Sequence, residues 1–191
     1  MNTHNEIRTI LKARKVNGRT LIFRNAEVTD AAFILSIRTD NKKSKFLMPV
    51  SPVIDHQVTW LEEYADKIDQ VYFIIETIAG VPLGTVRLYD ANGDSFCWGS
   101  WALKDGAPHS AAIESALMVY SYATDHLGFR AAHQLNVCKE NENMCRFHES
   151  FGAERIRETE SFYVYQINLE KINAIRSKLK MYLAKAVTVE W

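Results

Sequence analysis

The chain has 191 residues, a length that predicts one compact domain. Lys and Arg together number 23, as do Asp and Glu, so the formal net charge is zero. With 47% hydrophobic residues this composition excludes a disordered chain, and the missing basic excess argues against a protein that binds nucleic acid through bulk charge.

The N-terminal part is ambiguous. Residues 5–16 carry apolar side chains at helical spacing, whereas Asn17-Gly18 is a hairpin turn signal, so we set residues 1–19 apart as an extension. A sheet and its first helices are predicted next: a strand over 20–24, a helix over 31–37 capped by Thr29-Asp30, a loop over 39–52, a helix over 55–67, and strands over 71–78, 82–89 and 95–103.

The longest helix is predicted over 110–127, with Ser110 as its cap and Gly128 ending it. The remaining predicted elements are a strand over 133–138, a helix over 141–151, a strand over 162–169 and a helix over 171–183. This order predicts an α+β layered domain with a mixed sheet over residues 20–169. Residues 170–191 form a C-terminal helix and tail that could pack on the domain or on the second subunit of a homodimer.

Cys97, Cys138 and Cys145 form an odd set without metal-ligand spacing, which is typical of reduced thiols in a cytoplasmic protein. The N-terminal residues are too polar for a signal peptide, and the most apolar stretch, residues 71–75, is too short to cross a membrane. We therefore expect a cytoplasmic protein with no metal, no membrane and no nucleic acid among its partners.

A functional site is expected where the strand over 95–103 leads into the helix that starts near Ser110. A helix N-terminus presents unpaired N–H groups and the positive end of the helix dipole, an arrangement that suits a phosphate group.

Four segments carry a family resemblance: residues 24–26 with Asp30-Ala31, residues 82–88, residues 114–128, and Asn141 followed by residues 147–152. In this order they resemble the GNAT acetyltransferase superfamily, which transfers acetyl from acetyl-CoA to an amine. The resemblance implies a GNAT-like three-layer fold whose central, mostly antiparallel sheet is splayed at the CoA site. It also implies acetyl-CoA as co-substrate and a small-molecule amine as acceptor.

The family's pyrophosphate loop falls on residues 107–112, which lack its glycines at the matched positions. Small side chains there still let the backbone approach a phosphate. The resemblance implies a CoA site made by the strand edge at Trp101, Ala102 and Leu103, the loop and helix start at His109, Ser110, Ala111 and Ala112, and Asn141. A simple helix N-cap is an equal alternative for Asn141.

Cys97 stands where many relatives carry a catalytic carboxylate, so the usual base is absent. Asp90 is the nearest carboxylate, although an Asp before Ala-Asn-Gly is also typical of a turn. His148 matches a Tyr that protonates the leaving thiolate in the family, and histidine titrates near neutral pH. A half-exposed helix histidine without a catalytic role is the alternative for His148.

On a regular strand the odd separation of Trp98 and Trp101 would place them on opposite faces, one in the core and one in the acceptor pocket. A core role for both tryptophans is an equal alternative. These tryptophans, with residues 87–90, resemble bacterial relatives that acetylate amino sugars carried on nucleotides. Trp60, Arg87 and Trp98 are therefore the predicted acceptor-binding residues.

We expect an N-acetyltransferase that works by direct attack in a ternary complex, with an amino sugar of glycan synthesis as acceptor. The alternatives are an acetyltransferase for protein or peptide N-termini and a catalytically silent acyl-CoA-binding module.

Overall fold

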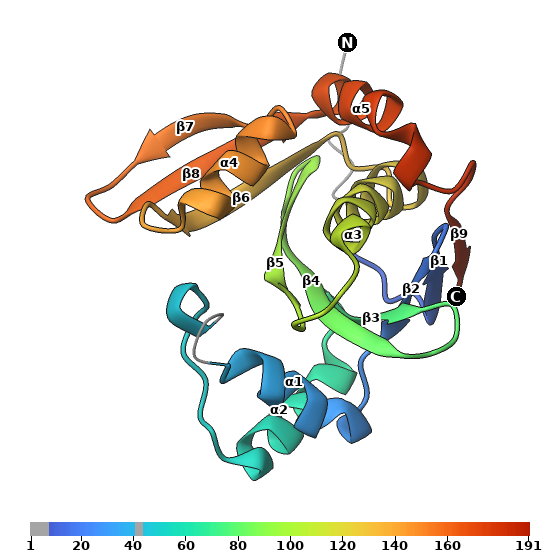
Figure 1. Cartoon of the computed structure of the whole chain (residues 1–191), viewed down its shortest axis with the longest axis vertical. Coiled ribbons are helices and arrows are strands. Elements are labelled where there is room, and N and C mark those ends of the chain that lie inside the picture. Colours follow the sequence, from blue (N-terminus) through green and yellow to red (C-terminus); the bar gives the residue numbers. More distant parts are fainter. Residues whose placement is uncertain (1–7, 41–43) are drawn as a thin grey trace.

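The computed structural model describes residues 8–40 and 44–191, so residues 5–7 of the ambiguous N-terminal segment and 41–43 of the predicted loop lie outside it. A sheet runs through the described chain in the order β7-β8-β6-β5-β4-β3-β2-β1-β9 (Figure 1). All neighbouring strands pair antiparallel except β5 and β6, which confirms the predicted mixed, mostly antiparallel sheet. The strands are β1 (Lys15–Asn17), β2 (Leu21–Asn25), β3 (Val71–Thr77), β4 (Pro82–Asn92), β5 (Ser95–Leu103), β6 (Ala131–Cys138), β7 (Glu154–Glu158), β8 (Phe162–Asn168) and β9 (Thr188–Glu190).

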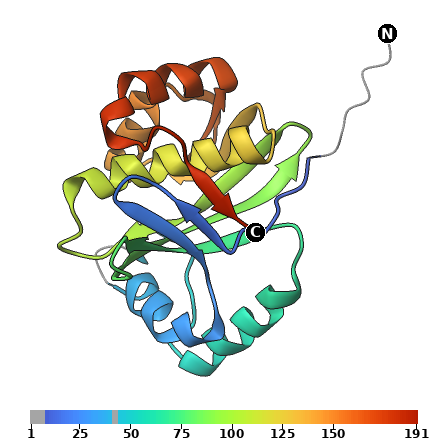
Figure 2. The ribbon, with the colours of Figure 1, turned by 90° about the vertical axis from the view of Figure 1, so that its right-hand side faces the viewer.

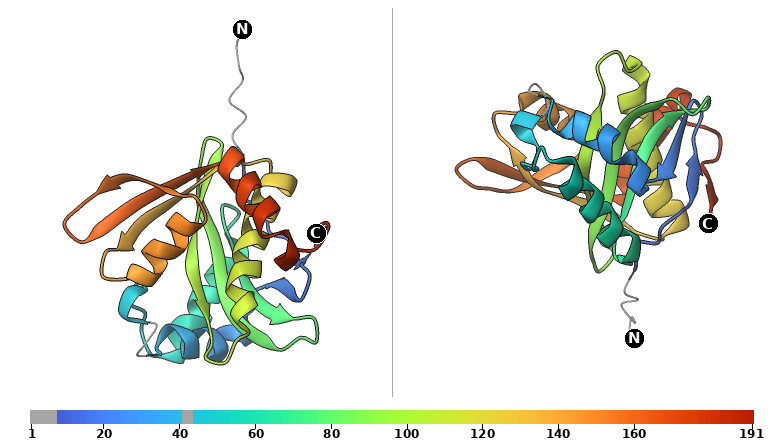
Figure 3. Two further views of the ribbon diagram at one scale, coloured as in Figure 1. Left: turned by 45° about the horizontal axis from the view of Figure 1, so that its top comes forward. Right: turned by 90° about the horizontal axis from the view of Figure 1, so that it is seen from below.

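Helices cover both faces of this sheet, which gives the predicted three layers (Figures 2 and 3). One face carries α1 (Ala31–Arg38) and α2 (Ile54–Asp66). The opposite face carries α3 (His109–Ser121), with α5 (Leu169–Lys178) beside it. The helix α4 (Glu142–Ser150) packs on β6 in the arm formed by β6, β7 and β8. Short turns of helix complete the set: η1 (Val28–Asp30), η2 (Ser44–Phe46), η3 (Tyr122–His126) and η4 (Lys180–Tyr182).

The described part of the N-terminal segment and the C-terminal segment are both built into the sheet. The turn at Asn17-Gly18 joins β1 to β2, and β9 pairs with the outer edge of β1. Ile10, Val16 and Val187 are buried in the same core cluster as the apolar side of α3. The terminal segments therefore extend the sheet beyond the part of the chain that carries the family resemblance.

A buried carboxylate fastens the N-terminal hairpin to α3. Glu114 is 2% exposed and accepts hydrogen bonds from the backbone N–H groups of Arg19, Thr20 and Leu21. The Thr20 hydroxyl donates to its other oxygen. A Cβ on Gly18 would lie 2.8 Å from the same carboxylate, so the turn needs glycine to come this close. The Glu114 carboxylate therefore accepts the hydrogen bonds of backbone N–H groups in this turn that have no acceptor in a neighbouring strand.

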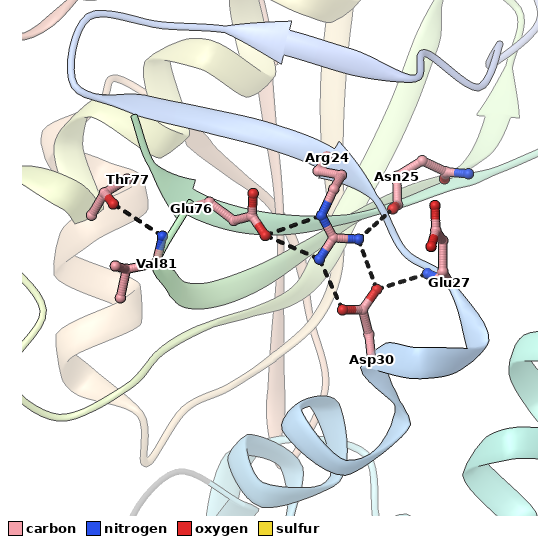
Figure 4. A network of polar contacts seen from close by, with 7 residues as sticks. All are labelled: Arg24, Asn25, Glu27, Asp30, Glu76, Thr77 and Val81. Atoms are coloured by element: carbon pink, nitrogen blue, oxygen red, sulfur yellow. Dashed lines mark hydrogen bonds and ion pairs between the residues drawn. The ribbon is translucent and has the colours of Figure 1, made fainter. Parts of the chain in front are cut away.

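Ion pairs fix the connection from β2 to α1 (Figure 4). The Arg24 guanidinium binds both carboxylate oxygens of Asp30, and it also contacts Glu76 on β3 at 3.0 Å. These two carboxylates raise the pKa of Arg24. Asp30 also accepts from the backbone N–H of Glu27, so its side chain organises the turn before the helix instead of capping the helix directly. This network holds α1 at the angle that brings its last residue, Arg38, toward the sheet.

Several elements differ from the sequence prediction. No strand was predicted for the terminal segments, which contain β1 and β9, and the C-terminal helix ends at Lys178 instead of residue 183. The strand β7 was missed because its sequence, Glu-Arg-Ile-Arg-Glu, is exposed along its whole length and has no apolar alternation. Ser110 is not the cap of the long helix, which begins at His109 with Pro108 at the N-cap position. The helix over 110–127 is also not uniform, because its last turn widens into the π-helical segment η3.

No helix in the described ranges is long and apolar enough to cross a membrane.

Candidate active site

The candidate site lies where two parallel strands part. β5 and β6 pair only over Ser95–Cys97 and Ala131–His133, after which β5 continues to Leu103 without a strand on that edge. The edge from Trp98 onward therefore offers backbone donors and acceptors to an extended ligand, in the manner of an added strand. This opening is the splay that the sequence predicted.

A bulge in β5 shapes the floor of the opening. The pairing with β4 shifts between Thr85–Ala102 and Arg87–Gly99, which leaves two residues of β5 opposite one of β4. Ser100, inside the bulge, has a φ of 48°, in the left-handed region that non-glycine residues seldom adopt. Its carbonyl accepts from the Thr85 hydroxyl at 2.7 Å and its hydroxyl accepts from Arg38 at 3.0 Å, so both halves of the residue are held.

The bulge overturns the prediction that Trp98 and Trp101 face opposite sides of the sheet. The extra residue shifts the alternation by one position, and the two rings meet edge to face with centroids 5.4 Å apart. Trp98 is buried, and the Trp101 indole N–H donates to Ser115 on α3. Both tryptophans line the same cleft.

We call this opening the central cleft. It lies between the bulged part of β5, the start of α4 and the segment after η2. Lys45 of η2 forms an ion pair with Glu140, just before α4, at 3.7 Å. The cleft is lined by Arg38, Phe46, Leu47, Met48, Tyr89, Trp98, Gly99, Ser100, Trp101, Val137, Cys138, Asn141, Met144 and His148.

His148 faces the central cleft from α4 and is buried, not half-exposed. Its ring stacks on Tyr165 at 5.5 Å and meets Trp98 edge to face at 5.8 Å. Nδ1 has no hydrogen-bond partner. Burial lowers the pKa of His148 to about 4, and nearby Glu149 only partly opposes this shift. The premise that this imidazole titrates near neutral pH is therefore wrong for the free protein, in which the ring is neutral at pH 7.

A second hollow adjoins the central cleft, and we call it the aromatic pocket. The two share Arg38, Met48, Tyr89 and Ser100. Trp60 and Arg87, both predicted as acceptor-binding residues, line the aromatic pocket, whereas Trp98 lines the central cleft. The aromatic pocket is lined by Ile34, Arg38, Met48, Pro49, Val50, Gln57, Trp60, Tyr72, Arg87, Tyr89 and Ser100.

The residues predicted to bind CoA lie along one path. Trp101, Ala102 and Leu103 form the end of β5 beyond the parting of the strands. His109, Ser110, Ala111 and Ala112 form the first turn of α3, where no side chain caps the helix. Of these four, only Ala111 is buried, and its N–H already bonds to Pro108. The leading amides of an uncapped helix are free to bind an anion, so this turn fits a phosphate despite its missing glycines.

Asn141 serves as the N-cap of α4, since its side chain accepts from the N–H of Met144 at 3.3 Å. This confirms the capping alternative. Asn141 also lines the central cleft, so its position is compatible with a second contact to a ligand.

Asp90 does not join the other candidates. It has a φ of 52°, and its carboxylate contacts His133 Nε2 at 3.2 Å. The other ring nitrogen of His133 lies 2.8 Å from the Ser95 hydroxyl. These three residues line a separate hollow bordered by β7 and β8. Asp90 lies within β4, at a second bulge where the pairing with β5 shifts between Tyr89 and Asn92, and not in the turn at Gly93 that the sequence alternative predicted.

Sequence reasoning missed Arg38 and Tyr89, which border both hollows. Arg38 is the last residue of α1, far from the recognised motifs, and only the folded chain brings it to Ser100. Tyr89 lies over Gly99, where an added Cβ would be 2.9 Å from its hydroxyl. No sequence signal marked Arg38, whereas Tyr89 belongs to the segment that carried the resemblance to amino-sugar enzymes.

No cluster of three or more His, Cys, Asp or Glu side chains able to hold a metal occurs within residues 8–40 and 44–191.

Comparisons with known proteins agree with this geometry. A family model described as an acetyltransferase (GNAT) domain matches residues 20–154. The structure of apo FdhC, described as a nucleotide-linked sugar GNAT, is 32% identical and has a TM-score of 0.76, covering 93% of this chain and 100% of its own. Comparison with curated protein sequences gave no significant match.

Two further solved structures share the fold at lower identity. A GCN5-related N-acetyltransferase from Brucella melitensis is 17% identical with a TM-score of 0.74, covering 93% of this chain and 89% of its own. A chimera of the Vibrio cholerae spermidine N-acetyltransferase SpeG and hSSAT is 15% identical with a TM-score of 0.68, covering 81% and 99%.

The neutral, buried state of His148 predicts a pH-dependent stability. As the pH falls below about 6.5 the unfolded chain binds a proton that the folded ring resists down to about pH 4, so the folded state loses stability across this window. Between pH 7 and pH 5 the loss from this residue is roughly 2 kcal/mol. Urea unfolding at the two pH values is expected to show this loss in the wild type and its absence in His148→Leu. The control Met144→Leu, on the same helix and without a titrating group, keeps the loss; an equal loss in all three proteins would contradict the assignment.

Proposed function

Because this chain belongs to the GNAT acetyltransferase family, we propose that it transfers the acetyl group of acetyl-CoA to the amine of a nucleotide-linked amino sugar. The observation that carries the donor half is the parting of β5 and β6 directly before the uncapped N-terminus of α3. The observation that carries the acceptor half is the composition of the two hollows, which contain arginines and aromatic rings and, among the described residues, no carboxylate.

The donor site follows the strand edge and the helix start. The amides of the pantetheine arm would complete the ladder of β5 at Trp101, Ala102 and Leu103. The pyrophosphate would lie at the first turn of α3, where His109, Ser110 and Ala112 are not buried. Asn141 would meet the same arm from the start of α4. Acetyl-CoA supplies the activated acetyl group as a thioester.

The absence of a lining carboxylate bears on the acceptor's pKa. A lysine-like amine costs about 4.6 kcal/mol to deprotonate at pH 7, whereas an amine with a pKa near 7.8 costs about 1 kcal/mol. A cleft with two arginines and no lining carboxylate also repels a polycation. Both arguments favour an amine of low pKa, such as an amino sugar, over a polyamine. FdhC, a solved relative described as a nucleotide-linked sugar GNAT, supports the same acceptor class.

In the proposed mechanism the free amine attacks the acetyl carbonyl directly, and the C–N bond forms as the C–S bond breaks. The attacking nitrogen loses one proton and the departing sulfur gains one. His148 is neutral, lines the cleft and has an unpartnered Nδ1, so its imidazole can take the proton at one ring nitrogen and give one from the other. The ring stays neutral but ends as its other tautomer, which proton exchange with solvent converts back before the next cycle. Trp98 and Tyr165 hold the plane of the ring.

The donor site predicts a charge effect at α3. Acetyl-CoA at about a hundred times its dissociation constant should add about 2.7 kcal/mol to the stability of the wild type. Ser110→Glu places a carboxylate where the phosphates would bind, so the dissociation constant of acetyl-CoA should rise about tenfold in this variant. The variant should still fold, because a carboxylate at a helix N-terminus interacts favourably with the helix dipole. Thermal unfolding with and without acetyl-CoA measures both. Ser150→Glu, an exposed change at the end of α4, should behave as wild type.

No stabilisation of the wild type would overturn acetyl-CoA binding. Equal stabilisation of Ser110→Glu and wild type would overturn the placement of the phosphates at α3.

The acceptor is identified by measuring thiol release from acetyl-CoA with a nucleotide-linked amino sugar, the free amino sugar, spermidine and peptides with free N-termini. We expect the highest kcat/KM for the nucleotide-linked sugar. A preference for the peptides would establish the N-terminal acetyltransferase instead. Binding of acetyl-CoA without thiol release in any arm would establish the catalytically silent module.

The proposed proton transfer predicts the effect of His148→Gln. The amide keeps the ability to form hydrogen bonds but cannot relay a proton, so kcat should fall about 100-fold at saturating substrates. The matched control is Cys138→Ser, which changes the one thiol lining the central cleft and should retain turnover, because direct attack uses no acyl-cysteine. Wild-type turnover by His148→Gln would rule out the relay.

A further inference from the structure

Two guanidinium groups line the aromatic pocket without a carboxylate partner among the described residues. Arg38 donates to the Ser100 hydroxyl and to the Met48 carbonyl at 2.7 Å, which are neutral acceptors. Its Nε is buried and has no partner. A charge taken out of water in this way is costly unless an opposite charge compensates it.

Arg87 is held between aromatic rings. Its Cζ lies 5.4 Å from the ring centroid of Trp60 and 5.0 Å from that of Tyr89. Its Nε is also buried without a partner, and burial lowers its pKa. By contrast, Arg24 and Arg176, which are also partly buried, form ion pairs with Asp30 and Asp125. These two ion pairs compensate the charges of Arg24 and Arg176, whereas Arg87 forms no ion pair with a described residue, and Asp69 only partly opposes the lowering of its pKa by burial.

The unpartnered atoms converge on one place. The Tyr72 hydroxyl, a third buried polar atom in the lining of the aromatic pocket, makes no well-aligned hydrogen bond. Burial raises its pKa, and the nearby Thr85 and Arg38 side chains partly oppose that rise. Trp60 meets the Tyr72 ring edge to face at 5.6 Å, so an indole borders the same space. In the described residues, three of the six buried, unpartnered side-chain atoms therefore line this one pocket. A ligand in this pocket that accepts hydrogen bonds and carries negative charge would compensate the charges of both guanidinium groups.

We propose that Arg38 and Arg87 bind a phosphoryl group of the acceptor, with Arg87 as the residue that determines specificity for phosphorylated over unphosphorylated amines. A guanidinium fork matches two phosphoryl oxygens, and two forks match the charge of a diphosphate. The aromatic pocket opens into the central cleft at Tyr89 and Ser100, so an amine linked to this phosphoryl group reaches the cleft. The inference rests on the proposed function and adds the recognition element that selects the acceptor.

The test uses pyrimidine nucleoside diphosphates as probes, titrated into the full chain saturated with CoA, so that the donor site is occupied and cannot bind them. We expect binding by the wild type, and a dissociation constant raised about 10- to 100-fold in Arg87→Gln. Arg87→Lys should recover only part of the affinity, because an ammonium lacks the fork. Arg130→Gln, a change of an exposed arginine outside both hollows, should bind as the wild type.

Competition experiments then distinguish a phosphoryl group from a carboxylate as the bound anion. Pyrophosphate should compete with the nucleotide, whereas glucuronate should not; competition by glucuronate at equal concentration would overturn the phosphoryl assignment. Failure of the wild type to bind the nucleotides, or equal binding by Arg87→Gln, would overturn the inference. Acetyl-CoA affinity of each variant shows that it is folded.

The two proposals fail in distinguishable ways. Thiol release with a free amino sugar, at a kcat/KM equal to that with the nucleotide-linked sugar, would overturn the phosphoryl subsite and leave acetyl transfer intact. Nucleotide binding that depends on Arg87, without thiol release from any amine, would support the subsite and overturn the proposed reaction.

Discussion

The candidate site depends on a parallel ladder only three residues long. Ser95–Cys97 pairs with Ala131–His133, and this short contact joins the β6–β8 arm to the rest of the sheet. A longer ladder would close the edge of β5 and leave a ligand no backbone to pair with. A shorter one would weaken the link that holds α4, and with it His148 and Asn141, opposite the bulged strand. The three-residue ladder thus keeps the sheet continuous and still leaves the edge of β5 open to an extended ligand.

The bulge at Ser100 acts on the same strand in a different way. By adding one residue it turns both tryptophans to one side and brings the hydroxyl of Ser100 to Arg38. The unusual φ of Ser100 carries a conformational cost, and its bonds to Thr85 and Arg38 offset that cost. Local strain in β5 therefore connects the central cleft with the aromatic pocket, since Ser100 borders both.

The features that could be predicted from the sequence are those that depend on residues close together in the chain. The bounds of β5 and the hairpin turn at Asn17-Gly18 follow from alternation and turn chemistry, whereas the pocket positions of Trp60 and Arg87 came from the family resemblance. The sequence could not predict the bulge, because the alternation count assumes a regular strand, nor β7, whose side chains are all exposed. The neutral state of His148 was also beyond reach, since its pKa depends on burial by Trp98 and Tyr165 from distant strands. Arg38 was also missed, because its contact with Ser100 joins residues 62 positions apart in the sequence.

The distribution of unsatisfied polar atoms separates structural from functional burial in this domain. Glu114 is as deeply buried as any charged group described, and four donors meet its carboxylate, so its burial serves the fold. Six buried side-chain atoms of the described residues make no hydrogen bond: those of Arg38, Tyr72, Arg87 and His148 line the two joined hollows, and those of Gln70 and Ser121 lie outside them. A fold that can satisfy a buried carboxylate so fully has the means to satisfy the four groups in the hollows as well. Their missing partners are therefore best supplied by ligands, an anion for the arginines and a transferred proton for the imidazole.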